Sequence, residues 1–292
     1  MATSCPACLA ENTRKWGRKN DFLILKCNSC GHGFVDPMPE PSVLAELYDE
    51  QSYGTRKVDA ADASEIKRTE ELYPNATLDA ERMLRTAKAM LNNSELSMLD
   101  VGCGYGFSSR TAKELGMRAT ALEISSNGRN MTKEIAELDP VPSTFDDFTT
   151  EDKFDIILMS QVVEHVSSID TWAKKASDVM TDNGILVMAM PNFNNIVALL
   201  LRENDPYIAP PMHVNYFTPR SATSWLNRSG FDHVTIKGVS RLGPRTVIKR
   251  LPFLPENRGL ISFIRFLQDI PFRLFGLMGF PIMLNVYARR KK

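Results

Sequence analysis

The chain has 292 residues, with 35 basic and 35 acidic side chains and a hydrophobic content of 43%. This length and composition support a full hydrophobic core with room for a small extra module. The zero net charge excludes any assignment of a binding partner from overall charge.

The first feature along the chain is a pair of C-x-x-C motifs separated by eighteen residues, formed by Cys5, Cys8, Cys27 and Cys30. Four thiolates at this spacing match a structural zinc site of the ribbon type. The alternating stretch 22–25 between the motifs favours a short hairpin. Disulfide bonds are the alternative, but residues 1–10 lack the features of a signal peptide, which favours a reducing compartment and zinc. We therefore predict a zinc ribbon over residues 1–36, with His32 as a solvated loop histidine.

A linker and helical cap are expected over residues 37–94. The proline-rich stretch 37–41 forms a stiff connector, and residues 42–92 have a helical pattern. Tyr48 and Tyr53 have two alternative roles. They either cover the mouth of a binding site in the following core or pack the helix on which they lie.

The most informative segment is residues 99–106, in which an apolar, strand-like start leads into three glycines within five positions. A helix-compatible stretch, 107–115, follows at once. Glycines let the backbone approach a ligand closely, and a helix N-terminus offers unpaired N–H groups. The spacing is neither the dinucleotide fingerprint nor a P-loop. The segment predicts a site for another nucleoside-containing small molecule.

The residues that follow predict an α/β, doubly wound parallel sheet. The stretch 118–124 is a second strand that ends near Glu123, where a carboxylate can accept hydrogen bonds from ribose hydroxyls. Two further buried strands are expected at 154–159 and 184–192, with helices between the strands near 127–138 and 169–180.

Taken in order, these segments resemble class I S-adenosylmethionine-dependent methyltransferases over residues 80–240. Residues 99–106 resemble the first motif of that family, and Glu123 resembles its ribose-binding acid. Residues 145–148 (Phe-Asp-Asp-Phe) resemble the segment that contacts adenine. Residues 161–166 (Gln-Val-Val-Glu-His-Val) resemble the segment that trails the fourth strand.

Residues 182–186 resemble the start of the family's fifth strand, although Asp182 and Asn183 replace the usual Pro and Gly. The resemblance implies a seven-stranded Rossmann-like sheet built from the core at 95–240, with an antiparallel last strand in the extension at 241–292. It also implies that S-adenosylmethionine is bound by a set of residues around the strand ends: Asp100, Gly102, Cys103, Gly104, Gly106, Glu123, Ile124, Asp146, Asp147 and Gln161. For Cys103, packing in the turn is preferred to a role as nucleophile.

Catalysis requires a base only if the acceptor is a hydroxyl group or an acidic carbon. The chain has four histidines. His213 lies in a stretch, 210–219, that resembles the acceptor side of small-molecule methyltransferases, and it is the first candidate. His165, after the fourth predicted strand, is the second. The alternative for both residues is a structural role, such as bonding to loop backbone.

The extension contains an apolar insertion at 251–280 before the expected last strand. Charged residues and Pro271 interrupt it, so it does not predict a transmembrane span. Residues 259–280 have three possible roles: an interfacial helix on a membrane, a cover over the acceptor pocket, or a dimer contact. The stretch 237–292 is basic and contains only two acidic residues, Glu256 and Asp269.

We expect a methyltransferase that acts on a small-molecule acceptor, such as a hydroxyl of a sugar, glycolipid or secondary metabolite. Its expected location is the cytoplasm, with the cytoplasmic face of a membrane as a further possibility. An RNA methyltransferase is one alternative, but the Asn/Asp-Pro-Pro motif typical of nucleic-acid amino methylation is absent at 160–163, so nucleic acid is not the expected partner. A non-catalytic cofactor-binding module is the other. The sequence does not identify the acceptor.

Overall fold

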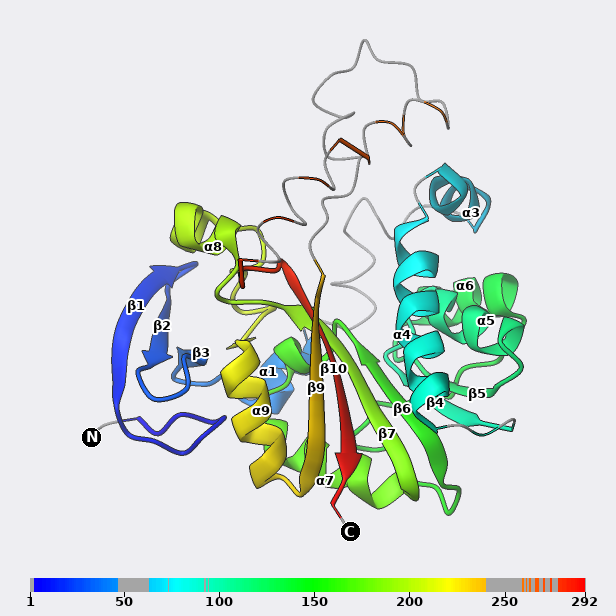
Figure 1. Ribbon diagram of the computed structural model, residues 1–292, viewed down its shortest axis with the longest axis horizontal. Coiled ribbons are helices and arrows are strands. Elements are labelled where there is room, and N and C mark those ends of the chain that lie inside the picture. The colour runs from blue at the N-terminus through cyan, green and yellow to red at the C-terminus, as the bar shows by residue number, and fades with distance from the viewer. Residues whose placement is uncertain are drawn as a thin grey trace.

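The computed structural model shows a central sheet with helices on both faces and a small second sheet at its flank (Figure 1). It describes residues 3–46, 63–72, 74–91, 93, 95–239 and 278–291. Seven isolated residues are also described, namely Gly259, Ile261, Phe263, Phe266, Leu267, Ile270 and Leu274.

The central sheet has six strands in the order β5-β4-β6-β7-β10-β9. Their bounds are β4 Ser97–Val101, β5 Arg118–Leu122, β6 Phe154–Ser160, β7 Met180–Pro191, β9 Phe231–Val239 and β10 Met283–Arg290. The strands from β5 to β7 are parallel, and β10 is antiparallel to both of its neighbours. The predicted α/β class and the antiparallel last strand are confirmed.

The third strand of the expected seven is reduced to a single bridge. Val141 pairs in parallel with Leu122 at the outer edge of β5. Pro140 and Pro142 flank Val141, and proline lacks the N–H that a continuing ladder would need. One residue therefore occupies the position of a full strand.

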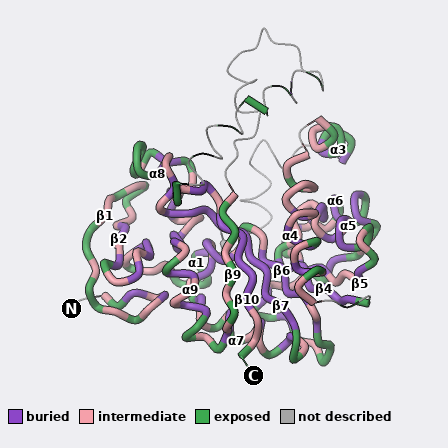
Figure 2. The backbone as a smooth tube through the Cα atoms, in the orientation of Figure 1, coloured by how far each residue is buried: buried purple, intermediate pink, exposed green. Residues whose placement is uncertain are grey.

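Helices pack on both faces of the sheet because the strands are buried on both faces (Figure 2). Alternate strand residues separate into two clusters: Leu99 and Ile157 lie in one, and Met98 and Ile156 in the other. The first cluster is covered by α7 (Ile169–Val179) and α9 (Pro219–Arg228), and the second by α4 (Asn75–Leu91) and α5 (Phe107–Glu114). Next to α5 lie α6 (Ser126–Ala136) and α3 (Ala63–Leu72), which share a smaller cluster.

The small sheet combines the N-terminal module with a piece of the core. Its order is β1-β2-β3-β8, with bounds Thr13–Lys19, Phe22–Cys27, Gly33–Asp36 and Asn215–Tyr216. All three pairings are antiparallel. The predicted hairpin is confirmed as β1 and β2. The fourth strand, β8, however, lies far along the chain, after β7 of the central sheet.

Short helices complete the described chain: α1 Pro41–Glu46, α8 Ile196–Leu201 and the 3-10 turns η1 Val163–His165 and η2 Arg202–Asn204. The predicted helical cap is thus α1, α3 and α4 where it is described, and Tyr48 and Tyr53 lie outside the described residues. Most of the insertion at 251–280 also lies outside them. Among the described helices, none combines the length and the apolar character needed to cross a membrane.

Candidate functional site

The glycine turn joins β4 to α5 at the carboxyl edge of the parallel strands. Gly102, Gly104 and Gly106 have φ angles of +66°, +56° and +79°, in the left-handed region that side chains other than glycine rarely adopt. A Cβ atom at Gly106 would lie 2.8 Å from the Thr132 side chain, whereas a Cβ at Gly104 would meet nothing within 4 Å. Gly106 therefore permits close helix packing, and Gly104 leaves an open face on the backbone.

Glu123 follows β5 and its carboxylate lies against this turn. Oε2 accepts a hydrogen bond from the Gly104 amide at 2.8 Å, and Oε1 accepts one from the Ser125 amide at 2.9 Å. Burial raises the pKa of Glu123, and these backbone hydrogen bonds act in the opposite direction. The structure thus brings together the turn and the acid that the sequence predicted as one site.

Gly128 is a site residue that the sequence reasoning missed. It lies in the first turn of α6, and a Cβ atom there would be 2.8 Å from Cγ of Glu123 and 3.1 Å from the Gly104 carbonyl oxygen. Glycine at this position lets α6 approach both groups. The sequence signal for this close approach was a glycine a few residues after Glu123.

Asp100 and Cys103 link the glycine turn to the neighbouring helices α5 and α6. Asp100 is buried and accepts a hydrogen bond from Ser109 Oγ at 2.7 Å, and its burial raises its pKa to about 6. The Cys103 sulfur lies 3.4 Å from Thr132 Oγ1, and burial raises the pKa of its thiol. A raised pKa disfavours the thiolate, which agrees with packing as the role of Cys103.

The other predicted cofactor residues follow the ends of neighbouring strands. Ile124 comes after β5 and Gln161 after β6, so both lie at the same edge as the glycine turn. Gln161 has a φ of +59° and donates from Nε2 to the Ala189 carbonyl at 3.1 Å. Asp146 accepts a bond from Trp172 Nε1 at 2.9 Å, and Asp147 accepts one from Thr144 at 2.7 Å.

Two histidines form a second centre. The Nδ1 atom of His165, in η1, lies 2.8 Å from the Met212 carbonyl oxygen, and Nδ1 of His213 lies 2.8 Å from that of Tyr207. A carbonyl only accepts, so each Nδ1 carries the proton and each Nε2 carries the lone pair. The rings meet edge to face with centroids 4.7 Å apart. The sequence named both histidines but did not predict their contact.

Glu164 joins this pair. It is 1% exposed, and neither carboxyl oxygen has a hydrogen-bond partner. Burial raises its pKa to about 8, so the carboxyl is mostly protonated at neutral pH. One oxygen of Glu164 and one ring nitrogen each of His165 and His213 lie within 4.8 Å of one another, a spacing also open to metal binding. Glu164 belongs to the segment 161–166 that resembles a family motif, but the sequence alone did not predict a role for its side chain.

A pocket lies beside His213. It is lined by apolar residues together with polar ones from the end of β7 and the loop before β8, namely Asn192, Asn195, Asp205, Tyr207, His213 and Asn215. Asp205 is fully buried, and Asn195 Nδ2 donates to it at 3.3 Å. The cavity has a volume of about 10 Å³, which is room for about one water molecule beside the candidate base.

The four N-terminal cysteines converge at the end of the small sheet. Their sulfurs lie within 4.8 Å of one another, with 3.6 Å from Cys5 to Cys30 and from Cys8 to Cys27. A tetrahedral zinc ion with bonds of about 2.3 Å separates its sulfurs by about 3.8 Å. The shared hydrogen bond of Cys5 and Cys30 lowers the pKa of Cys5 and raises that of Cys30, so these two thiols hold one proton between them. The donor set fits zinc, and the four cysteines are free rather than disulfide-bonded.

The prediction for His32 was wrong. Its side chain is fully buried rather than solvated, with Nε2 3.2 Å from Asn215 Oδ1 and its ring edge to face with Phe217 at 4.8 Å. The reason is β8, which covers this end of the small sheet. No local pattern around His32 could show that a strand from residue 215 would pack there.

Comparisons with known proteins agree with this geometry. Residues 75–236 match a family described as a methyltransferase domain. A curated relative, the ubiquinone biosynthesis O-methyltransferase of Rhodopseudomonas palustris (strain HaA2), is 31% identical over 115 residues. That alignment covers 38% of this chain and 46% of the relative, so the chain spans about half the length of the curated relatives it matches.

Solved structures share the fold at low sequence identity. A SAM-dependent methyltransferase from Archaeoglobus fulgidus has a TM-score of 0.53 and 18% identity, covering 77% of this chain and 99% of that chain. Phosphoethanolamine N-methyltransferase 2 of Haemonchus contortus, in complex with S-adenosyl-L-methionine, has a TM-score of 0.57 and 15% identity, covering 89% and 62%.

Glu164 makes a prediction about stability. Its pKa is raised from 4.5 to about 8 in the folded chain, so the folded state holds the proton that the unfolded state releases between these pH values. Its contribution to the free energy of unfolding should therefore fall as pH rises from about 4.5 to 8, at up to about 1.4 kcal/mol per pH unit. Glu164→Gln should remove this slope in denaturant titrations.

The matched control is Glu134→Gln, because Glu134 is exposed on α6. We expect this variant to keep the slope of the parent protein. Parallel curves for Glu164→Gln and the parent would contradict the assignment of a buried, protonated carboxyl.

Proposed function

The chain belongs to the methyltransferase-domain family, and we propose that it uses S-adenosylmethionine to methylate a hydroxyl group of a small molecule. One observation carries the proposal: the glycine–carboxylate centre follows β4 and β5, and the two contacting histidines follow β6 (His165) and β7 (His213) of the same parallel set of strands. The first centre suits a nucleoside-containing donor, and the second suits an acceptor that must lose a proton.

The donor side uses the open face at Gly104 and the carboxylate of Glu123. Glu123 lies at the carboxyl end of β5, and hydrogen bonds from the Gly104 and Ser125 amides fix the orientation of its carboxylate. In this orientation it would accept hydrogen bonds from the ribose hydroxyls. Four further residues would contact the bound cofactor, namely Ile124, Asp146, Asp147 and Gln161. When bound, S-adenosylmethionine supplies a methyl group that its sulfonium has already activated.

His213 is the proposed base. Burial lowers its pKa, so the imidazole stays neutral at neutral pH and below, with the lone pair on Nε2. The Tyr207 carbonyl fixes the ring through Nδ1, which leaves Nε2 to accept the proton of the acceptor hydroxyl. His165 is held in the same way against His213 and is the second candidate. Positioning and exclusion of water supply the remaining rate.

Hydroxyl acceptors are supported by this base and by the curated relative, which is named as an O-methyltransferase. The proposed acceptor is a hydroxylated molecule such as a sugar, a glycolipid or a secondary metabolite. The direct test is an incubation of purified protein with radiolabelled S-adenosylmethionine and a cell extract fractionated into RNA, lipid and soluble metabolites. Label in the RNA fraction alone would overturn the proposal.

We also propose that the four cysteines bind one structural zinc ion. Cys27→Ser should release the metal and lower the melting temperature, because three thiolates and a hydroxyl hold zinc more weakly. The measurement is metal analysis of the purified chain beside a thermal scan. Cys103→Ser is the control, since Cys103 lies outside the cluster, and it should retain the metal. A parent protein without zinc would contradict this assignment.

Glu123→Ala should weaken S-adenosylmethionine binding by about 10- to 100-fold, because hydrogen bonds to a charged group are worth about 1.5–3 kcal/mol. Isothermal titration calorimetry measures this directly. Glu114→Ala, on the exposed side of α5, is the matched control and should bind as the parent does. Unchanged affinity for Glu123→Ala would remove Glu123 from the donor site.

His213→Ala should lower kcat by about 10²- to 10⁴-fold, the usual contribution of a general base, with little change in cofactor affinity. Because burial lowers the pKa of His213, the parent protein should keep its activity to a lower pH than a base with the pKa of a free histidine would allow. His233→Ala is the control, because His233 is 77% exposed beside Asp232. A His213→Ala variant with parental kcat would transfer the role to His165.

A further inference from the structure

We propose that the cysteine ribbon, residues 3–36, positions His213 and His165, and that Asn215 links the ribbon to the segments that carry both histidines. The inference rests on the proposed function, in which these histidines meet the acceptor. A ribbon at the end of a chain is otherwise expected to be an independent module. The contacts described below connect it to the histidine pair on two sides.

The first connection is a shared strand. β3 of the ribbon pairs with β8, so that Gly33 faces Tyr216 and Phe34 faces Asn215. The Val35 amide also donates to the Val214 carbonyl at 3.1 Å. Because His213 is the residue before Val214, the ribbon strand determines where the backbone of His213 runs.

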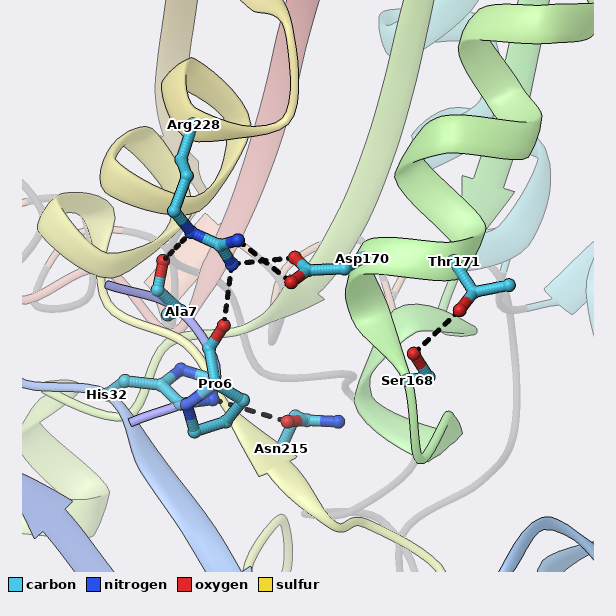
Figure 3. A network of polar contacts seen from close by, with 8 residues as sticks. All are labelled: Pro6, Ala7, His32, Ser168, Asp170, Thr171, Asn215 and Arg228. Atoms are coloured by element: carbon cyan, nitrogen blue, oxygen red, sulfur yellow. Dashed lines mark hydrogen bonds and ion pairs between the residues drawn. The ribbon is translucent and has the colours of Figure 1, made fainter. Parts of the chain in front are cut away.

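The second connection is the side chain of Asn215, which is 1% exposed. Its Oδ1 lies 3.2 Å from His32 Nε2 of the ribbon (Figure 3). Its Nδ2 donates to the Val166 carbonyl at 2.6 Å. Val166 directly follows His165. One buried amide therefore joins the ribbon to the segments that carry both histidines.

The third connection reaches the loop before His213. Asn20 Nδ2, at the tip of the β1–β2 hairpin, donates to the Pro210 carbonyl at 2.7 Å, and Lys19 Nζ donates to the Asp205 carbonyl at 3.3 Å. His213 thus lies between two ribbon contacts, the hairpin tip on one side and β3 on the other. The loop that orients its ring cannot shift without breaking one of them.

The ribbon is itself firmly attached to the core. Arg228 of α9 donates to the Pro6 and Ala7 carbonyls and pairs with Asp170 of α7 at 2.6 Å (Figure 3). Thr218 Oγ1 donates to the Cys30 carbonyl at 3.0 Å. Six buried ribbon residues belong to the same apolar cluster as the core helices α7 and α9, namely Cys5, Ala7, Leu25, Cys27, Cys30 and Phe34. The cysteine segments of the ribbon are thus packed into the core of the protein, which prevents the ribbon from moving independently of it.

Metal binding at the cysteines would therefore affect the histidine pair. The zinc knuckle at Cys27 and Cys30 is continuous with His32 and β3, and both contact Asn215. Loss of the metal should loosen the segments at 163–166 and 212–216 while leaving the glycine turn intact. Loss of the metal should thus change the histidine segments, on the acceptor side, without changing the glycine turn, on the donor side.

The test uses the full chain and two variants. Asn215→Leu replaces the linking amide with an apolar side chain of similar size, and Asn20→Gly removes the contact at the hairpin tip while tolerating the φ of +47° there. Arg18→Ala is the matched control, because Arg18 bonds to Asp21 within the same exposed hairpin. Each protein is examined by hydrogen exchange, by calorimetry with S-adenosylmethionine, and by kcat and KM for the acceptor.

We expect faster amide exchange at 163–166 and 212–216 in both variants and in zinc-stripped parent protein. We expect a fall of about tenfold or more in kcat/KM for the acceptor, with cofactor affinity within about twofold of the parent. Arg18→Ala should match the parent in every measurement. If Asn215→Leu fails to fold, Asn20→Gly and zinc removal still provide the exchange result.

Unchanged exchange at these segments in Asn20→Gly and in zinc-stripped protein would overturn the inference. An equal loss of cofactor affinity would overturn it too, because the effect would then be global. If the parent methylates no acceptor, the proposed function fails, but the exchange experiment still decides whether the ribbon holds the histidine segments.

Discussion

The burial of both faces of the parallel sheet is the constraint on which the rest of the structure depends. Strands β4, β6 and β7 direct alternate side chains into two apolar clusters, which leaves no place for polar chemistry on either face. Functional groups gather instead where the strands end. The glycine turn, Glu123, and the segment of Glu164 and His165 each follow the carboxyl end of a strand. Their proximity is a consequence of parallel pairing.

Within this edge, the two halves of the site are stabilised differently. The donor half is held by backbone geometry, through left-handed glycines and the bond from the Gly104 amide to Glu123. The acceptor half is held by contacts between distant segments, because the loops that carry His165 and His213 have little regular structure of their own. The ribbon supplies part of the order that those loops lack, through β3 and Asn215.

Several features were predictable from the residues alone because their signals are local. The cysteine spacing, the glycine turn and the acid after β5 each lie within a short stretch, and the structure brings each group together. The fold pattern led us to expect a full third strand, whereas the structure has only the bridge at Val141. Pro140 and Pro142, which cannot donate to a strand ladder, were the local signal for this difference. The burial of His32 was missed because its partner lies more than 180 residues away in the chain.

The sequence by itself determined the fold class and indicated that the glycine turn, Glu123 and the four cysteines form local groups, because backbone conformation, hydrophobic periodicity and ligand spacing act over a few residues. Only the tertiary structure decided which groups meet on the acceptor side. The contact of His165 with His213, the unpartnered carboxyl of Glu164 and the joining of β3 to β8 all depend on chain segments that pack together from far apart. Long-range packing leaves no pattern in a single stretch of sequence, so the shape of this half of the site is a property of the folded chain.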